Sequence, residues 1–411
     1  MRFLLCGQGT SEILWSIQAA LVDLGHESVL ALPDISQDVL DRRIDALFVL
    51  NLFEIPRPTV EMLRGYIAQF GGQPGKGPAI VHICLKHPLE EIGAGTAEQI
   101  RAADRWMADN SVSMWCMCRG SAEQAVRLGL SRVFHEPLGV HRWICTAPAA
   151  DDSVDLYKRW MAPDTPGLQR HPYAAMKGPS DHMAETSARD RVLYLGQGWP
   201  DHLESGREPV SPAIQRDAEA VAATMMEQPA LHRVQAMDKC GLAGHSVDPA
   251  WTLEFNRAFT IAFAVENRRR FAIALRHGLG EGFALWGNGW ERFGLDAGPV
   301  SAAPRNAYHS AAACLDFGSL AYDTAIFPRT LEIVKRNGLL VSWRHADTAQ
   351  LFGACEDALT FTGEDDALRL LSALSTDADH RARLRSAHLD HCFDALALTA
   401  ILPRVIARVR G

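Results

Sequence analysis

Residues 2–34, RFLLCGQGTSEILWSIQAALVDLGHESVLALPD, are the stretch that indicates the fold class. A short apolar run leads into the glycine-containing turn at 7–10. Apolar residues then recur at helical spacing, namely Ile13, Leu14, Ile17, Leu21 and Leu24. Gly25 is a helix stop, and a second apolar run follows it. A strand, a helix and a further strand in this order are typical of a parallel, doubly wound sheet.

The same alternation continues along the chain and predicts two α/β domains in tandem. Apolar strand-like runs recur at 46–52, 78–85, 113–117 and 132–135, and again at 191–196, 282–286, 313–316, 339–343 and 358–361. Between the two sets, a stretch rich in Pro, Ala, Asp and Ser interrupts the periodicity. We therefore predict a first domain at 1–150, an excursion at 151–190, a second domain at 191–395 with a helical insert at about 209–270, and a C-terminal helix at 396–411.

Composition narrows the classes of function. The 411 residues carry a formal net charge of −8 and no block of Lys or Arg, which argues against a nucleic-acid partner. No apolar run is long enough to predict a transmembrane segment. The nine cysteines are scattered and odd in number, which favours reduced thiols and a cytoplasmic protein. Cys116 and Cys118 have no second pair at ligand spacing, so we expect no metal site.

Residues 322–343, YDTAIFPRTLEIVKRNGLLVSW, place a cation at the start of a predicted helix. A helix N-terminus carries partial positive charge, so Arg329 is unfavourable there unless an anion is bound beside it. Arg329 is therefore either a solvated loop residue or a phosphate ligand. Glu332 follows within the first turn, where a carboxylate is favourable without any ligand.

The segment from Trp286 to Phe352 resembles bacterial glycosyltransferases of the spore-maturation (CgeB-like) type, which have the GT-B architecture. The residues in register with that pattern are Gly287, Gly289, Trp290, Arg329, Glu332, Gly338 and Phe352. In the first domain, the turn Gly139-Val140-His141 is similar to a Gly-Val-Asp turn of the family, with histidine in place of the acidic residue.

This resemblance implies two facing Rossmann-like domains with parallel sheets and a C-terminal helix, and a nucleotide-sugar donor bound to the second domain. The donor is a substrate, and no cofactor is implied. Arg329, with Thr330 beside it, would stabilise the charge that develops on the leaving diphosphate without a metal. Glu332 would accept hydrogen bonds from the nucleotide ribose. Gly287, Asn288 and Gly289 end a strand, where they either admit a ligand close to the backbone or form a plain turn.

The first domain is then expected to hold the acceptor, which could be a glycan, a lipid carrier or a protein. The loop with Gly7, Gly9 and Thr10 would face the cleft and touch the donor diphosphate or the acceptor. If the reaction inverts the anomeric centre, it needs a base, and His87 just after a predicted strand is the candidate. A structural role in the loop is the alternative for His87. His82 is predicted to be a core residue.

Two further patterns are predicted to carry no chemistry. Asp377-Ala378-Asp379 has the form of a metal-binding motif, but its place between two helical stretches favours a helix cap. His388, His391 and Cys392 are predicted to lie on an exposed helix with no metal. Two functions remain as alternatives to glycosyl transfer: a sugar-nucleotide epimerase with the same layout, and a degenerate GT-B protein that only recognises a sugar nucleotide or glycan.

Overall fold

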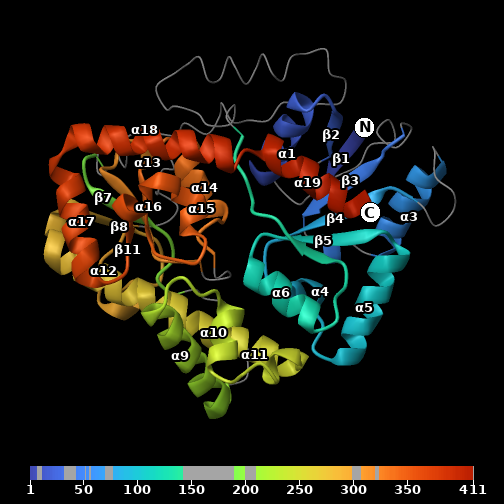
Figure 1. Cartoon of the computed structure of the whole chain (residues 1–411), viewed down its shortest axis with the longest axis horizontal. Helices are drawn as coiled ribbons and strands as arrows, with labels where there is room; N and C mark the ends of the chain where they lie inside the picture. The colour runs from blue at the N-terminus through green and yellow to red at the C-terminus, as the bar shows by residue number, and fades with distance from the viewer. Residues whose placement is uncertain are drawn as a thin grey trace.

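The structure, a computed structural model, describes ten stretches of the chain: residues 1–6, 12–31, 43–50, 52–54, 57–69, 77–141, 189–199, 210–298, 307–319 and 324–410. Three predicted site residues, Gly7, Gly9 and Thr10, lie outside these stretches. Residues 151–188 of the predicted excursion also lie outside them. The described residues confirm the predicted fold class, since they form two α/β domains, each with a parallel sheet, and a C-terminal helix (Figure 1).

The first domain is built on a six-stranded parallel sheet with the order β2-β1-β3-β4-β5-β6. Its strands are β1 (Arg2–Cys6), β2 (Glu27–Ala31), β3 (Ala46–Leu50), β4 (Ala79–Cys84), β5 (Val112–Cys116) and β6 (Val133–His135). The helices of this domain are α1 (Glu12–Asp23), α3 (Arg57–Gln69), α4 (Pro88–Ile92), α5 (Ala97–Asp109) and α6 (Arg119–Arg127). Crossover helices of this kind are what parallel pairing requires.

The second domain has a five-stranded parallel sheet with the order β11-β10-β9-β7-β8. Its strands are β7 (Val192–Leu195), β8 (Phe283–Trp286), β9 (Ala313–Asp316), β10 (Leu340–Trp343) and β11 (Thr360–Phe361). Around it lie α12 (Glu266–Leu279), α13 (Ala307–Ser310), α14 (Pro328–Lys335), α15 (Thr348–Phe352), α16 (Glu356–Leu359) and α17 (Glu364–Thr376). The central strand β9 is buried at every residue, which is typical of parallel sheets covered on both faces.

The predicted insert is helical, and it reaches the first domain. It contains α9 (Pro212–Glu227), α10 (Arg233–Lys239) and α11 (Pro249–Phe259), and a π-helical turn at Thr260–Val265 joins α11 to α12. Four polar pairs connect it to α6, and we call them the polar clasp. They are Arg127–Asp238 at 2.8 Å, Glu123–His232 at 3.5 Å, Ser121–Arg233 at 3.1 Å and Gln124–Thr252 at 3.4 Å. Figure 1 shows α10 and α11 below α6.

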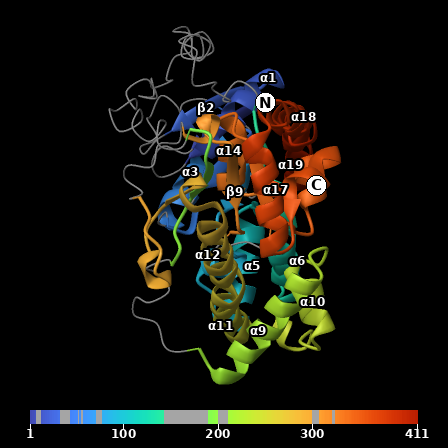
Figure 2. The same ribbon diagram turned by 90° about the vertical axis from the view of Figure 1, so that its left-hand side faces the viewer.

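The chain returns to the first domain at its C-terminal end. Helix α18 (Ala378–Ala395) runs from the second domain toward the first, where α19 (Leu398–Arg410) packs on α1 and β4 (Figures 1 and 2). At the start of α19, the backbone N–H of Leu398 donates to the Val140 carbonyl and the Val140 N–H donates to the Leu396 carbonyl, both at 2.9 Å. Gly139 lies so close that a Cβ there would come within 2.6 Å of the Leu396 carbonyl oxygen. The Gly139-Val140-His141 turn is therefore the docking point of the C-terminal helix.

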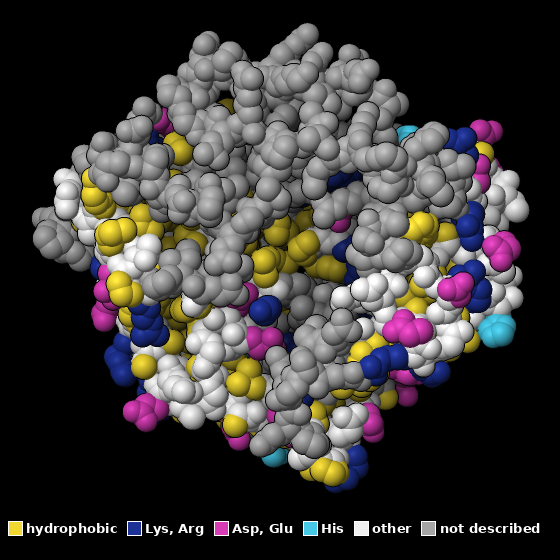
Figure 3. All heavy atoms as spheres, turned by 180° about the vertical axis from the view of Figure 1, so that it is seen from behind, with side chains coloured by type: hydrophobic (Ala, Val, Ile, Leu, Met, Phe, Trp, Pro, Cys, Tyr) yellow, Lys and Arg dark blue, Asp and Glu magenta, His cyan; other side chains and the backbone are white. Residues whose placement is uncertain are grey.

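The described surface is mixed in polarity (Figure 3), and the described cysteines are free thiols. On the face opposite the view of Figure 1, hydrophobic side chains gather around a hollow near the middle, and basic and acidic side chains are interspersed over the rest of the described surface (Figure 3). The described cysteines form no disulfide. Within the described stretches, every helix is too short or too polar to cross a membrane.

Candidate functional site

The carboxyl ends of β7, β8 and β9 form one edge of the second sheet, and glycines bring their following loops into contact. Gly287 has φ +141°, and a Cβ there would lie 1.9 Å from the Gly196 carbonyl oxygen. Gly289 has φ +81°, and its Cβ would lie 2.3 Å from the Trp199 carbonyl oxygen. The Asn288 carbonyl accepts the Gly198 N–H at 2.9 Å. Two backbone segments thus pack directly on each other, and only glycine permits this approach.

Arg329 lies at this edge. It is the second residue of α14, and its side chain reaches the end of β7, where Nη1 donates to the Tyr194 hydroxyl at 2.7 Å and to the Leu195 carbonyl at 3.3 Å. Nη2 donates to the Gly318 carbonyl at 3.4 Å and lies 3.6 Å from Asp316 Oδ1. Burial opposes the positive charge, but the Tyr194 hydroxyl and the Asp316 carboxylate outweigh it and raise the pKa of Arg329. The guanidinium therefore stays charged.

A second arginine, which no sequence pattern distinguishes from its neighbours, points to the same place. Arg268 of α12 is 1% exposed, and its Nη1 and Nη2 donate to the carbonyls of Gln197 and Gly318, both at 2.7 Å. Burial lowers its pKa to about 10, which still leaves it cationic at neutral pH. Arg268 follows Asn267 and begins a run of three arginines in the sequence. Arg268 differs from Arg269 and Arg270 only in the side of α12 on which it lies.

The acidic and aromatic partners of these arginines come from the neighbouring strands. Asp316 ends β9, is fully buried, and accepts the Gly318 N–H at 3.1 Å. Tyr194 of β7 stacks on Phe317 with ring centroids 4.5 Å apart. His345, just after β10, is 4% exposed and would lie 3.7 Å from a Cβ on Gly318.

Thr330 and Glu332 occupy different positions on α14. The Thr330 hydroxyl accepts the Phe327 N–H at 3.1 Å and lies 2.6 Å from the Ala325 carbonyl, so it fixes the start of the helix. Glu332 is half-buried one turn along α14. In the described part of the chain, the backbone N–H groups of Arg329 and Thr330 have no hydrogen-bond acceptor.

Two histidines for which the sequence predicted a role lie close to β4 of the first domain. His82 belongs to the strand, and His87 follows it. His87 is 2% exposed and is the N-cap of α4, where its Nδ1 accepts the Leu89 N–H at 3.2 Å. His82 is fully buried, as predicted, and its Nε2 lies 3.4 Å from Glu91 Oε2. Glu91 also accepts the N–H groups of Leu85 and Lys86, at 2.8 and 2.9 Å. The Glu91 carboxylate and these histidines therefore hold the loop after β4 in place.

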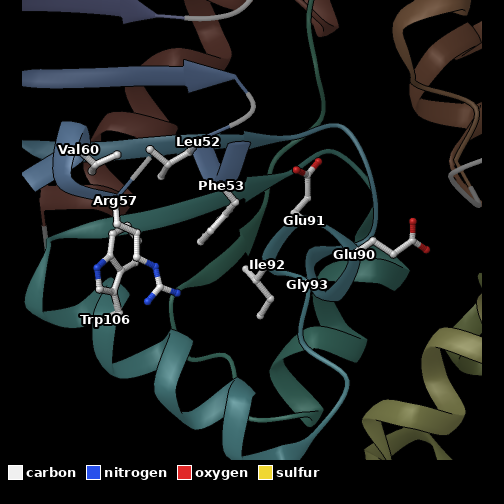
Figure 4. A pocket seen from close by; sticks show the side chains of 9 residues that line it. All are labelled: Leu52, Phe53, Arg57, Val60, Glu90, Glu91, Ile92, Gly93 and Trp106. Carbon is white, nitrogen blue, oxygen red and sulfur yellow. The ribbon is translucent and has the colours of Figure 1, made fainter. Parts of the chain in front are cut away.

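A pocket of about 230 Å³ lies at the carboxyl ends of β3 and β4 (Figure 4). Phe53 and Trp106 form aromatic walls, with ring centroids 6.0 Å apart. The Arg57 guanidinium lies over the Trp106 ring at 5.3 Å from its centroid. Ile92 and Glu91 line the side toward α4. The pocket therefore combines flat apolar surfaces with charged groups at its margin.

The remaining predicted motifs have structural roles. The Asp377 carboxylate accepts the His380 N–H at 2.8 Å and is the N-cap of α18, which confirms the predicted cap. His141 is buried and its Nε2 lies 2.9 Å from Asp23 Oδ2 of α1. Burial lowers the pKa of His141, although the Asp23 carboxylate opposes this shift.

The predicted exposure of the His388 segment was wrong. His388 is fully buried, with its Nε2 3.3 Å from Cys392 Sγ and its ring stacked on Phe352. The sequence of α18 is mostly polar and therefore does not predict a buried face. In the structure, α18 packs on α15, and this contact buries one side of α18.

Comparisons with known proteins match one segment of the chain to a family model and align the whole chain with solved structures at low scores. No curated protein matches this sequence. Among solved structures, the T4 phage protein BGT in complex with UDP and Mn2+ has a TM-score of 0.47 at 11% identity, with 100% of this chain and 99% of that chain covered. HepE of Anabaena in complex with UDP and glucose has a TM-score of 0.44 at 9% identity, with 100% and 99% covered. Sucrose-phosphate synthase from Thermosynechococcus elongatus has a TM-score of 0.41 at 10% identity, again with 100% and 99% covered.

One family model, described as glycosyl transferase-like, matches residues 267–398, which is less than half of the chain. The matched segment contains Gly287, Gly289 and Glu332 as well as both arginines, Arg268 and Arg329. The edge of the second sheet that gathers two cations is therefore built largely from a glycosyl transferase-like segment.

Proposed function

We propose that this protein is a glycosyltransferase that binds a nucleotide-sugar at the carboxyl edge of the second sheet. Arg329 stabilises the diphosphate as it leaves, and Gly287, Asn288 and Gly289 shape the strand end beside it. Glu332 accepts hydrogen bonds from the ribose, as the family resemblance implies. The observation that carries the proposal is the convergence of Arg268 and Arg329 on the Gly318 carbonyl, within a segment that is glycosyl transferase-like.

The charge balance at this edge favours an anion. Among the residues that the structure describes, two guanidinium groups face one carboxylate, Asp316, and their other partners are a hydroxyl and backbone carbonyls. Such an excess of positive charge in a partly buried place is favourable when a diphosphate is bound, because low polarity strengthens the attraction. The N–H groups of Arg329 and Thr330, which have no acceptor among the described residues, add donors at the positive end of α14. This arrangement supplies stabilisation without a metal, so we propose a metal-independent transfer.

We further propose that the first domain holds the acceptor, whose class is open between a glycan, a lipid carrier and a protein. The pocket of Figure 4 supports this assignment, because Phe53 and Trp106 offer flat faces at the carboxyl edge of the first sheet. Ligands of open α/β sheets bind at that edge.

The proposal predicts that one class of nucleotide stabilises the protein through Arg329. Thermal unfolding is measured with UDP, GDP, ADP and TDP and with their glucose or mannose esters. A nucleotide present at 100 times its dissociation constant adds about 2.7 kcal/mol to the free energy of unfolding. In Arg329→Ala this added stability is lost, because the variant lacks the cation that meets the diphosphate.

Arg381→Ala is the matched control for this experiment. Its side chain is 13% exposed, against 17% for Arg329, and it also donates to two carbonyls, those of Leu374 and Ser375. It lies on α18, outside the proposed site. Loss of nucleotide stabilisation in Arg329→Ala alone supports the donor site. Equal responses in wild type and Arg329→Ala, or no response to any nucleotide, contradict it.

With an identified donor, turnover gives a second test. Removing Arg329 is expected to raise the activation free energy by about 2 to 4 kcal/mol, by analogy with the loss of one oxyanion donor. A decrease in rate of less than about fivefold contradicts its role. Turnover that survives EDTA supports the metal-independent mechanism. Analysis of products separates transfer from epimerisation, since an epimerase converts the donor without an acceptor, and binding without any turnover indicates a recognition module.

A further inference from the structure

His135 ends β6, at the carboxyl edge of the first sheet and next to β5. Its Nδ1 lies 3.1 Å from the backbone carbonyl oxygen of Cys116, the last residue of β5. A carbonyl oxygen can only accept a hydrogen bond, so Nδ1 carries the proton of the neutral ring. The lone pair is therefore on Nε2, which makes no hydrogen bond with any described residue.

The surroundings of His135 keep the ring neutral near pH 7. Burial lowers the pKa of His135, and Arg119 at the start of α6 lowers it further. The hydrogen bond to Cys116 and the carboxylates of Asp347 and Glu136 act in the opposite direction but do not cancel the effect of burial. The Glu136 carboxylate is already held by Arg404 Nε at 2.9 Å. A neutral imidazole with an available Nε2 is the form that a general base requires.

An electrostatic interaction connects His135 with the second domain. Asp347 belongs to the second domain, yet it is close enough to act electrostatically on His135 of the first domain. Its carboxylate accepts the Ala325 N–H at 2.9 Å and is hydrogen-bonded to the Thr324 hydroxyl. Thr324 and Ala325 directly precede α14, the helix that carries Arg329. His135 thus interacts electrostatically with a carboxylate that holds the segment just before the proposed donor site.

We propose that His135 is the catalytic base that activates the acceptor hydroxyl, and that the transfer inverts the anomeric centre. This inference rests on the proposed glycosyltransferase function. The acceptor oxygen forms a bond to the anomeric carbon while its proton passes to Nε2 of His135. The bond from the anomeric carbon to the phosphate oxygen breaks, and its electron pair leaves with the nucleoside diphosphate. The imidazolium then releases its proton to water.

The geometry favours His135 over His87 for this role. The Nδ1 lone pair of His87 is directed at the Leu89 N–H inside the capping hydrogen bond, and the side chain is 2% exposed. His135 is less buried and keeps Nε2 out of the hydrogen bonds that fix its ring. His87→Gln is therefore expected to lower stability, and His135→Gln to lower turnover.

The test uses water as the acceptor, because the natural acceptor is unidentified. Release of nucleoside diphosphate is followed over hours for the full chain with UDP-glucose, GDP-mannose and ADP-glucose. His135→Gln is expected to lower the rate by about 100-fold or more, while thermal stabilisation by the same nucleotide stays at the wild-type value. His277→Gln, on an exposed residue in the last turn of α12, is the matched control and leaves the rate unchanged.

Two further measurements separate a base from a structural residue. The wild-type rate falls as the pH drops below the lowered pKa of His135, and this acid limb disappears in His135→Gln. Added imidazole partly restores the rate of His135→Ala and has no effect on the wild type. Anomeric analysis of the released sugar shows inversion.

Failure of this inference and failure of the proposed function give different results. If a nucleotide stabilises the protein but His135→Gln turns over within about fivefold of wild type, His135 is not the base. Retention of the anomeric configuration, or nucleotide binding with no release of nucleotide from its sugar, also overturns the base role. If no nucleotide stabilises the wild-type protein, the donor site itself is wrong and the role of His135 falls with it.

Discussion

Gly196 and Gly287, at the edge of the second sheet, both lack room for a Cβ atom. The atoms that a Cβ would meet differ between the two positions. A Cβ on Gly196 would lie 2.2 Å from Arg329 Nη1, which is the far end of a flexible side chain. A Cβ on Gly287 would instead meet the backbone carbonyl of Gly196 at 1.9 Å, in a conformation with φ +141°. The first substitution moves a side chain, and the second strains the backbone.

Gly196→Ala is therefore expected to unfold at nearly the wild-type temperature but to lose nucleotide stabilisation, because Arg329 is displaced. Gly287→Ala is expected to lose about 1 to 3 kcal/mol of the free energy of unfolding, the range of backbone strain at such positions. Thermal unfolding with and without UDP and GDP measures both effects. If the two variants lose stability equally and keep the same nucleotide response, the assignment of Arg329 is contradicted.

The sequence predicted individual residues where a local rule applies to them. Arg329 could be selected because it lies at the start of a predicted helix, where a cation is unfavourable unless an anion is bound beside it. Arg268 could not, since it stands beside two identical residues and the helix phase decides which one is buried. His87 and His135 both follow or end strands, and only the partner atoms of their rings distinguish a cap from an available base.

At the scale of elements, α18 shows how burial on one face changes the chemistry of a polar helix. Its His388 packs on Phe352 of α15, and burial together with the nearby His391 lowers the pKa of His388 to about 3. Between pH 6.5 and this value the unfolded chain binds a proton that the folded chain does not. Stability therefore falls as the pH is lowered through this window.

We expect the free energy of unfolding to fall by at most about 1.4 kcal/mol per pH unit from His388 alone. Urea unfolding at pH 7, 6 and 5 measures the slope. In His388→Leu the slope becomes shallower by that amount, whereas the same replacement of exposed His277 leaves it unchanged. Parallel pH profiles for wild type and His388→Leu would show that the buried ring is not responsible.

Strands and helices were predictable where their patterns are strong. The strands of both sheets are short apolar runs buried on both faces, and β1, β9 and β10 lie where the sequence places them. The face that α18 buries was not predictable, because its apolar periodicity is weak among many charged residues. Tertiary contact with α15 selects the buried side.

At the scale of the whole molecule, the polar clasp joins the insert to α6 on the side opposite the docked C-terminal helix. The sequence predicted two domains and a helical insert, but it gave no sign of what the insert would touch. Polar side chains on an amphipathic helix look the same whether they face water or another polar surface. The pairing became apparent only from the distances between α6 and the insert.

Within the clasp, the Arg127–Asp238 ion pair is expected to contribute little to stability. The Arg127 and Asp238 side chains are 36% and 40% exposed, and an exposed ion pair contributes about 1 kcal/mol or less. Asp238→Arg places like charges opposite each other and lowers the free energy of unfolding, and adding Arg127→Asp recovers most of that loss. A double-mutant cycle in urea measures the coupling. Additive effects of the two changes would contradict a direct interaction.

The docking of α19 has a consequence for how the chain acquires its structure during synthesis. Leu398, Ile401, Leu402 and Val405 are buried on α19 and complete the apolar core of the first domain. A ribosome adding about 5 to 20 residues per second takes on the order of tens of seconds to pass from the Gly139 turn to this helix. The domain that emerges first therefore waits, with part of its core uncovered, for a helix that is translated much later. Chaperones that bind exposed apolar surface would meet the nascent chain at that stage.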